Sequence, residues 1–453
     1  GGVSLGGIIA NSKSFIDLDH ATAAFVTDNL VLNDTATAVI NDTTITEGGI
    51  YHNGIGFLSL DNLTMSEKAS KIVLNSGDTT MTGVITLGSG SDQGVYVQGG
   101  SLSIGDTSLE KATQLSGMVS LSSGTVTVHN VDLLEKVVVQ SGIGIRQLIF
   151  NPLTSDGAIR IQNVQLGQME VNSSLRMTIG DSRSVRTGNL SGNGPITLIG
   201  QGSLTLGRLT DNTDYTGDIT WSGSSLSLTA DHALGTIGQL LVTGNFQGIL
   251  DVSGTGAHSK DLAIDSQTGS LTVTNQGGDR TTMTGTVRMS GILIKEGAGS
   301  LIIDDKTPEK PSWMNNVTVN AGSLTLIHVA DHGIAGRLTA NNGVLTLDGI
   351  DSNAVSDITV KGSLGKIVLT NASDIRSRVV SDFNAGRLIV DNDSSLIVNG
   401  LLDAGGSSAM TIDSGSLQVD GNMLLSGTGD WILRDVYLSS YDTMILSMEN
   451  LRG

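Results

Sequence analysis

The stretch Gly322-Ser323-Leu324-Thr325-Leu326 carries the pattern that decides the fold: a glycine and a serine followed by alternating apolar and polar residues. Variants of this pattern return along the chain at residues 100–104, 202–206, 269–273, 299–303 and 415–419. Alternation with a period of two predicts a short β-strand with one buried face, and the glycine allows the backbone to turn sharply before it. Because this turn and strand recur so often, we predict a solenoid whose function is spread along its surface.

The spacing of the repeats indicates which kind of solenoid to expect. Gly322 follows Gly299 by 23 residues, and Gly343 follows Gly322 by 21 residues. This length suits one three-strand coil of a parallel β-helix, whereas a β-propeller needs about 40 to 50 residues per blade and an antiparallel sandwich needs frequent two-residue hairpins. We therefore predict an all-β fold, a single parallel β-helix (β-solenoid) of roughly 20 three-strand coils with loop excursions.

Composition narrows the possible classes of function. The net charge of −19 argues against long-range attraction to nucleic acid or to an anionic membrane. The absence of cysteine excludes disulfides, thiol catalysis and cysteine-ligated metals, and it fits either a reducing cytosol or export of the unfolded chain through a pore. No stretch approaches the roughly 18 apolar residues of a membrane helix, and no signal-peptide pattern follows Gly1-Gly2, so we expect a soluble, mature or cut fragment.

Asparagines recur where the corners of the coils are expected. Stacking places like residues above like, so aliphatic ladders form a continuous core and corner amides can hydrogen-bond to the next coil. The candidates for this corner role are Asn275, Asn320, Asn341, Asn371, Asn392 and Asn399. A longer repeat supports the same organisation, because residues 230–235 are echoed 100 residues later at 330–335.

A resemblance to a known family is carried by residues 190–206, 211–220 and 291–301. They resemble the passenger-associated repeat of Gram-negative autotransporters, and the best matches lie within residues 190–336. The resemblance implies a right-handed parallel β-helix that is exported across the outer membrane and displayed on the bacterial surface, with a C-terminal β-barrel outside this sequence. It implies a passenger at 1–430 and the C-terminal end of the β-helix at 431–453, where an autochaperone-like region is expected to start.

The diffuse-adhesion and self-associating autotransporters are the members of that family most similar to this chain. The resemblance therefore implies a non-catalytic adhesin that binds host matrix components, such as glycosaminoglycans or fibronectin, and contributes to colonisation. Two alternatives stay open. One is self-association that aggregates bacteria and builds biofilm, and the other is a β-helical enzyme that cleaves polysaccharides.

Residues that suggest catalysis fit their motifs poorly. Gly180-Asp181-Ser182-Arg183-Ser184 departs from the nucleophile motif of serine-protease autotransporters, because Arg183 replaces a glycine beside the expected oxyanion hole. A glycan-cleaving enzyme needs converging carboxylates, but the nearest acids, at 304–305 and 391–393, lie on strands or turns where neighbours diverge. The histidines show no metal-ligand spacing. We predict no catalytic residue, no metal site and no cofactor.

Basic residues concentrate in one part of the chain, at Arg280, Arg288, Lys295, Lys306 and Lys310. Stacked coils could align some of them into a stripe that contacts sulfated or acidic glycans, although solvated charge is the simpler interpretation. Residues 304–316 interrupt the coil rhythm, because Pro308 and Pro311 cannot join a sheet. Trp313, if exposed, would anchor a partner. These five basic residues and Trp313 form the predicted ligand-binding set.

Overall fold

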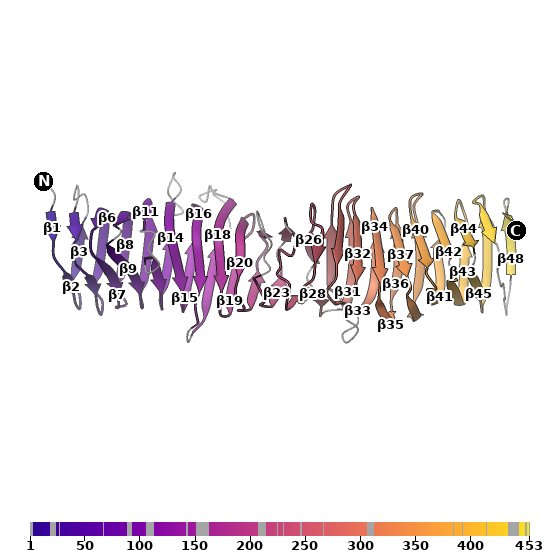
Figure 1. The fold of residues 1–453 in the computed structure, drawn as a ribbon, viewed down its shortest axis with the longest axis horizontal. Helices are drawn as coiled ribbons and strands as arrows, with labels where there is room; N and C mark the ends of the chain where they lie inside the picture. Colours follow the sequence, from indigo (N-terminus) through magenta and orange to yellow (C-terminus); the bar gives the residue numbers. More distant parts are fainter. Residues whose placement is uncertain are drawn as a thin grey trace. The chain divides into compact units, whose positions relative to one another are not determined.

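The computed structural model describes residues 3–18, 24–26, 28–66, 68–87, 93–105, 113–141, 144–150, 163–206, 214–223, 225–229, 231–244, 247–265, 267–305, 312–383, 385–391, 393–413, 415–433, 444–448 and 451–452. Over these residues the chain forms β-strands and turns and contains no helix. The chain divides into two compact units, Gly1–Leu226 and Ser227–Gly453. Each unit is a stack of parallel strands (Figure 1), so the predicted parallel β-solenoid is confirmed.

Three strands make one coil, and each coil pairs in register with the next. In the second unit, one coil consists of β36 (Arg337–Asn341), β37 (Val344–Asp348) and β38 (Asp351–Val355). The next consists of β39 (Asp357–Lys361), β40 (Lys366–Thr370) and β41 (Asp374–Phe383). β36 pairs with β39, β37 with β40 and β38 with β41, all in parallel.

The number of coils is slightly lower than the sequence predicts. The described residues make about 16 turns, whereas the repeat length predicts roughly 20. Some coils carry excursions that lengthen them. Leu134 of β16 (Val131–Val139), for example, stacks on Leu166 of β18 (Asn163–Val171), 32 residues later.

The core of the first unit is built from columns of stacked side chains. One ladder runs through β8 (Phe57–Met65), β10 (Asp78–Thr82), β13 (Ser101–Ile104), β15 (Gly124–Val128), β17 (Arg146–Phe150), β19 (Leu175–Ile179), β21 (Ile196–Ile199) and β23 (Ile219–Ser222). Its inward residues are all buried: Leu58, Thr79, Leu102, Val126, Leu148, Met177, Leu198 and Trp221. Each fully buried aliphatic side chain stabilises the fold by about 1.5–3 kcal/mol, so these columns hold the coils together with few aromatic residues.

The second unit contains a ten-stranded parallel sheet among its described residues. Besides β37 and β40, its strands are β27 (Ala257–His258), β30 (Arg280–Met283), β32 (Ser300–Asp304), β34 (Ser323–Ile327), β42 (Arg387–Asp391), β44 (Ala409–Asp413), β47 (Trp431–Leu433) and β49 (Leu451–Arg452). Trp431 is buried and stacks on Met410, so the ladder continues across the predicted boundary at residue 430.

Corner asparagines join successive coils through their side chains. In the first unit, amide-to-amide hydrogen bonds of 2.7–3.0 Å link Asn11, Asn33, Asn53 and Asn75. In the second unit, Asn320 donates to Glu296 at 2.6 Å and Asn371 donates to Asp348 at 2.5 Å. The predicted corner role is confirmed for these two residues, whereas Asn392 lies outside the described part of the chain.

Candidate ligand-binding groove

Trp313 is held on the outside of the second unit by strand alternation. It lies on β33 (Ser312–Val319), where Ser312 and Met314 point inward and are fully buried. The Trp313 side chain therefore points outward, and 40 % of the residue is exposed. In the preceding coil, Arg288 of β31 (Val287–Glu296) is the register partner of Trp313 and also faces outward. The parallel register thus places a guanidinium group and an indole ring on adjacent strands.

Two buried residues at the start of β33 fix the position of Trp313. The backbone N–H and the hydroxyl of Ser312 both donate to Oδ2 of Asp305, at 2.7 and 2.8 Å. The Ser312 hydroxyl oxygen in turn accepts the backbone N–H of Val287 at 2.8 Å. Asp305 is 5 % exposed and Ser312 is fully buried, so all three bonds are shielded from water and strengthen one another. They tie the strand that carries Trp313 to the strand that carries Arg288.

A groove of about 320 Å³ lies beside Trp313. It is lined by Gln267, Ser290, Trp313, Met314, Asn315, Gly333 and Ala335, which come from several successive coils. Asn315 is oriented by a hydrogen bond from its amide nitrogen to the backbone oxygen of Ser290, at 3.2 Å. The lining thus combines an aromatic face with amide and hydroxyl groups. This is the side-chain set that can stack on a sugar ring and hydrogen-bond to its hydroxyls.

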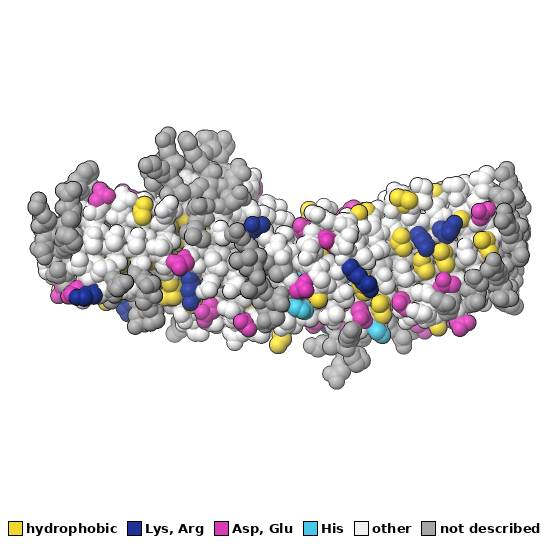
Figure 2. All heavy atoms as spheres, turned by 45° about the horizontal axis from the view of Figure 1, so that its top comes forward, with side chains coloured by type: hydrophobic (Ala, Val, Ile, Leu, Met, Phe, Trp, Pro, Cys, Tyr) yellow, Lys and Arg dark blue, Asp and Glu magenta, His cyan; other side chains and the backbone are white. Residues whose placement is uncertain are grey.

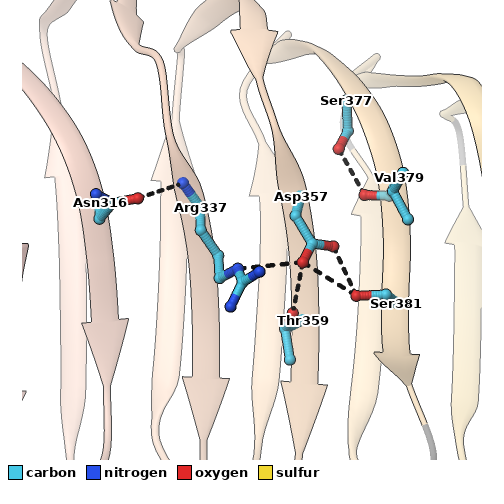
Figure 3. A network of polar contacts seen from close by, with 7 residues as sticks. All are labelled: Asn316, Arg337, Asp357, Thr359, Ser377, Val379 and Ser381. Atoms are coloured by element: carbon cyan, nitrogen blue, oxygen red, sulfur yellow. Dashed lines mark hydrogen bonds and ion pairs between the residues drawn. The ribbon is translucent and has the colours of Figure 1, made fainter.

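A polar network occupies neighbouring strands of the same unit (Figure 3). Nε of Arg337 lies 3.1 Å from Oδ2 of Asp357, and the backbone N–H of Arg337 donates to Oδ1 of Asn316 at 2.9 Å. The Ser381 hydroxyl contacts both carboxylate oxygens of Asp357, at 2.8 and 3.0 Å. Arg337 is therefore already paired. Arg288, in contrast, makes no hydrogen bond or ion pair with the described residues and is free to meet an anion.

The predicted basic stripe is wrong in two respects. Arg280 is exposed, but it lies on β30 of the ten-stranded sheet, whereas Arg288 and Trp313 belong to another sheet. Lys295 is fully buried, and its Nζ donates to backbone oxygens of Glu296 (2.5 Å) and Gly297 (2.8 Å). Burial lowers the pKa of Lys295 to about 8. Lys306 and Lys310 lie outside the described residues.

Strand parity explains the error at Lys295. Arg288 and Lys295 lie on the same strand, β31, and residues an odd number of positions apart point to opposite faces. Since seven positions separate them, an outward Arg288 requires an inward Lys295. The opposite orientation of Arg288 and Lys295 could therefore have been predicted from the sequence. Nothing in the sequence pointed to Gln267, Ser290 or Asn315, because only the stacking of coils brings them to one groove.

The acidic residues weighed as catalytic groups do not converge. Asp304 faces His328, with 2.8 Å between Oδ1 and Nδ1, whereas Asp305 turns inward to Ser312. Ser182 occupies a turn with a φ of 61°. Arg183 is buried, and its Nη2 donates to the backbone oxygen of His129 at 2.8 Å. The motif at 180–184 is thus a turn anchored by a buried arginine.

The described residues include no helix long and apolar enough to cross a membrane. Comparisons of the chain with protein families, with curated proteins and with solved structures find no match.

Proposed function

We propose that this chain is a non-catalytic adhesin of the bacterial surface that binds acidic host matrix components, such as glycosaminoglycans, at the Trp313 groove. The observation that carries the proposal is an exposed Trp313 next to an outward-facing Arg288, which has no ion-pair partner in the part of the chain that the structure describes, above a groove lined by amides. A guanidinium group can bind a carboxylate or sulfate through two parallel hydrogen bonds. The indole face can stack on a sugar ring.

The acidity of the chain shapes this mode of binding. With a net charge of −19, the protein as a whole repels a polyanion, so attraction must come from a local cation. One arginine and one tryptophan give weak binding per site. Many copies on one cell would compensate through avidity, provided that one matrix chain can reach several of them.

Display outside the cell is part of the same proposal. It is supported by the confirmed β-solenoid, by the lack of cysteine and by the resemblance of residues 190–220 and 291–301 to the autotransporter passenger repeat. Fibronectin is the protein ligand that we would test after the glycans themselves.

Tryptophan fluorescence offers a direct test. Of the three tryptophans, Trp221 and Trp431 are 0 % and 2 % exposed, so an aqueous quencher such as iodide reaches Trp313 selectively. Heparin titrated into the purified chain should protect Trp313 from the quencher, and raised salt should weaken this protection.

Two variants locate the contact. Arg288→Gln should lower heparin affinity at least ~10-fold, consistent with loss of a charge-assisted hydrogen bond. Arg186→Gln, which alters an exposed arginine of the first unit, is the matched control and should bind like the parent. Heparin binding that leaves Trp313 quenching unchanged, or that survives Arg288→Gln, would refute the assignment of this groove.

A further inference from the structure

The groove beside Trp313 is part of a longer face of the second unit, and buried residues fix the alignment of that face. Met289, Met314 and Ile334 are register partners in three successive coils. In the fourth coil, the Ser352 hydroxyl donates to the backbone oxygen of Ile334 at 2.5 Å. All four side chains are fully buried, so the residues directly before and after each of them face outward and form two neighbouring columns.

In the described part of this face, a basic side chain stands between two acidic ones. In order along the stack, one column contains Arg288, Trp313, Gly333 and Asp351. Asp265 stands one coil before Ser290 in the neighbouring column, because Ile264 is the register partner of Met289. Arg288 therefore has Asp265 one coil away on one side, and Asp351 three coils, about 14 Å along the stack, away on the other.

Both acids are accessible to a ligand in the groove. Asp265 and Asp351 are exposed, and neither carboxylate forms a hydrogen bond or an ion pair with the part of the chain that the structure describes. Asp265 lies two residues before Gln267, which lines the groove. At the other end, Asp374 and Arg376 lie in the coil after Asp351, so Asp351 is closer to the groove than either of them.

This order of charges restricts where a ligand can carry its own charges. At physiological ionic strength an exposed charge acts over about 8 Å, which is one to two coils. An acidic group of a ligand is therefore attracted at Arg288 and repelled near Asp265 and near Asp351. We infer that the groove selects acidic glycans in which uncharged or amino sugars flank an acidic group, and that Asp265 and Asp351 are the residues that determine this specificity. The inference rests on the proposed binding of glycans at Arg288 and Trp313.

A uniformly sulfated chain matches this arrangement poorly. On the face of the second unit drawn in Figure 2, acidic side chains are spread over the surface and basic side chains stand in small groups between them. The whole chain has a net charge of −19, so every sulfate that does not meet a cation adds repulsion. An ammonium group on the ligand has the opposite effect, because Asp265 or Asp351 attracts it.

Three forms of one polymer test this selection in the Trp313 quenching assay. The first is heparin, and the second is N-desulfated heparin, which carries an ammonium group in place of each N-sulfate. The third is N-desulfated heparin that has been N-acetylated, so that the same positions are uncharged. At equal salt, the parent should bind the ammonium form about 2- to 5-fold more tightly than the acetylated form, the range expected for an exposed charge pair.

Variants of the two acids assign the preference to this groove. Asp265→Asn and Asp351→Asn should each reduce the preference for the ammonium form over the acetylated form, and the double variant should abolish it. The same variants should bind N-sulfated heparin more tightly than the parent, because a repulsive charge is removed. Asp430→Asn is the matched control. It removes an exposed acid directly before β47 of the ten-stranded sheet, and it should keep the preference of the parent.

The outcomes separate this inference from the proposed function. If the parent binds none of the three polymers, or if Arg288→Gln leaves their binding unchanged, the proposed function fails and the inference fails with it. If binding depends on Arg288 but the parent does not distinguish the ammonium form from the acetylated form, glycan binding stands and the selection by charge is overturned. A preference that survives in the double variant, or that Asp430→Asn removes equally well, would likewise overturn the roles of Asp265 and Asp351.

Discussion

The buried Lys295 allows the sharpest test of the structure, because among the described residues its ammonium group is bonded to backbone oxygens and to no carboxylate. Its Nζ donates to the backbone oxygens of Glu296 and Gly297, and burial lowers its pKa from 10.5 to about 8. At 1.36 kcal/mol per pKa unit, this shift corresponds to about 3 kcal/mol. The folded chain therefore binds this proton less tightly than the unfolded chain does.

The sign of the pH effect follows from the direction of that shift. Below pH 8 both states carry the proton, and the folded state bears the full cost of the buried charge. Between pH 8 and 10.5 the folded state releases the proton while the unfolded state keeps it, so the stability contributed by this residue rises with pH. The gain should approach about 3 kcal/mol near pH 10.5.

Urea denaturation at pH 7, 8.5 and 10 measures this gain when the parent is compared with Lys295→Met. Other lysines and tyrosines titrate in both proteins and cancel in the difference. The free energy of unfolding of the parent should rise relative to the variant as pH increases. A difference that stays constant between pH 7 and 10, or that moves in the opposite direction, would refute the argument that Lys295 is buried and protonated at neutral pH.

Three further perturbations test a buried histidine, the stacking of the core and a glycine corner. His258 is 3 % exposed, and burial lowers its pKa to about 4. Its contribution to stability is therefore complete above pH 6.5 and is lost as the pH falls towards 4. His258→Gln should flatten that part of the curve of unfolding free energy against pH, and an unchanged curve would contradict the burial. Leu345→Ala, at a buried position of β37, should lower the free energy of unfolding measured in urea by about 2–5 kcal/mol. Val344→Ala, at the half-exposed neighbouring position, should lower it by under about 1 kcal/mol. Equal losses would mean that the register is wrong. In Gly322→Ala the new Cβ would lie against the backbone oxygens of Gly299 and Gly297, at a residue whose φ is 64°, so this variant should have a lower melting temperature than the parent. In the control Gly6→Ala the new Cβ meets open space, and the melting temperature should not change. Similar melting temperatures for the two variants would argue against tight stacking at the Gly322 corner.

Much of the fold could be predicted because it depends on short-range patterns. Alternation of apolar and polar residues, as at residues 322–326, predicts a strand wherever it occurs in the chain. The spacing of 21 to 23 residues between the glycines matches the length of one coil. Corner asparagines such as Asn320 and Asn371 could be named because stacked coils repeat the same corner chemistry. The number of coils was less accurate, because excursions such as the one between Leu134 and Leu166 break the period.

The candidate groove could be predicted only in part. Trp313 was chosen because it follows two prolines that cannot join a sheet, and the structure exposes it. The basic residues were grouped because they lie close together in the sequence. This criterion fails in a solenoid, because two residues seven positions apart on one strand point to opposite faces, whereas two residues a whole coil apart in sequence lie side by side. For this reason Arg280 lies on a different sheet from Arg288, and Lys295 is buried.

The sequence by itself determined that this chain folds into stacked coils of short strands, because glycine turns and period-two alternation act over a few residues. Only the tertiary structure decided which side chains meet. The register between coils places Arg288 beside Trp313. Arg280 lies on another sheet, the ten-stranded sheet, together with Lys366 and Arg387, which are register partners on adjacent strands. Register depends on the summed packing and hydrogen bonding of whole ladders, and no single segment of the sequence carries that sum.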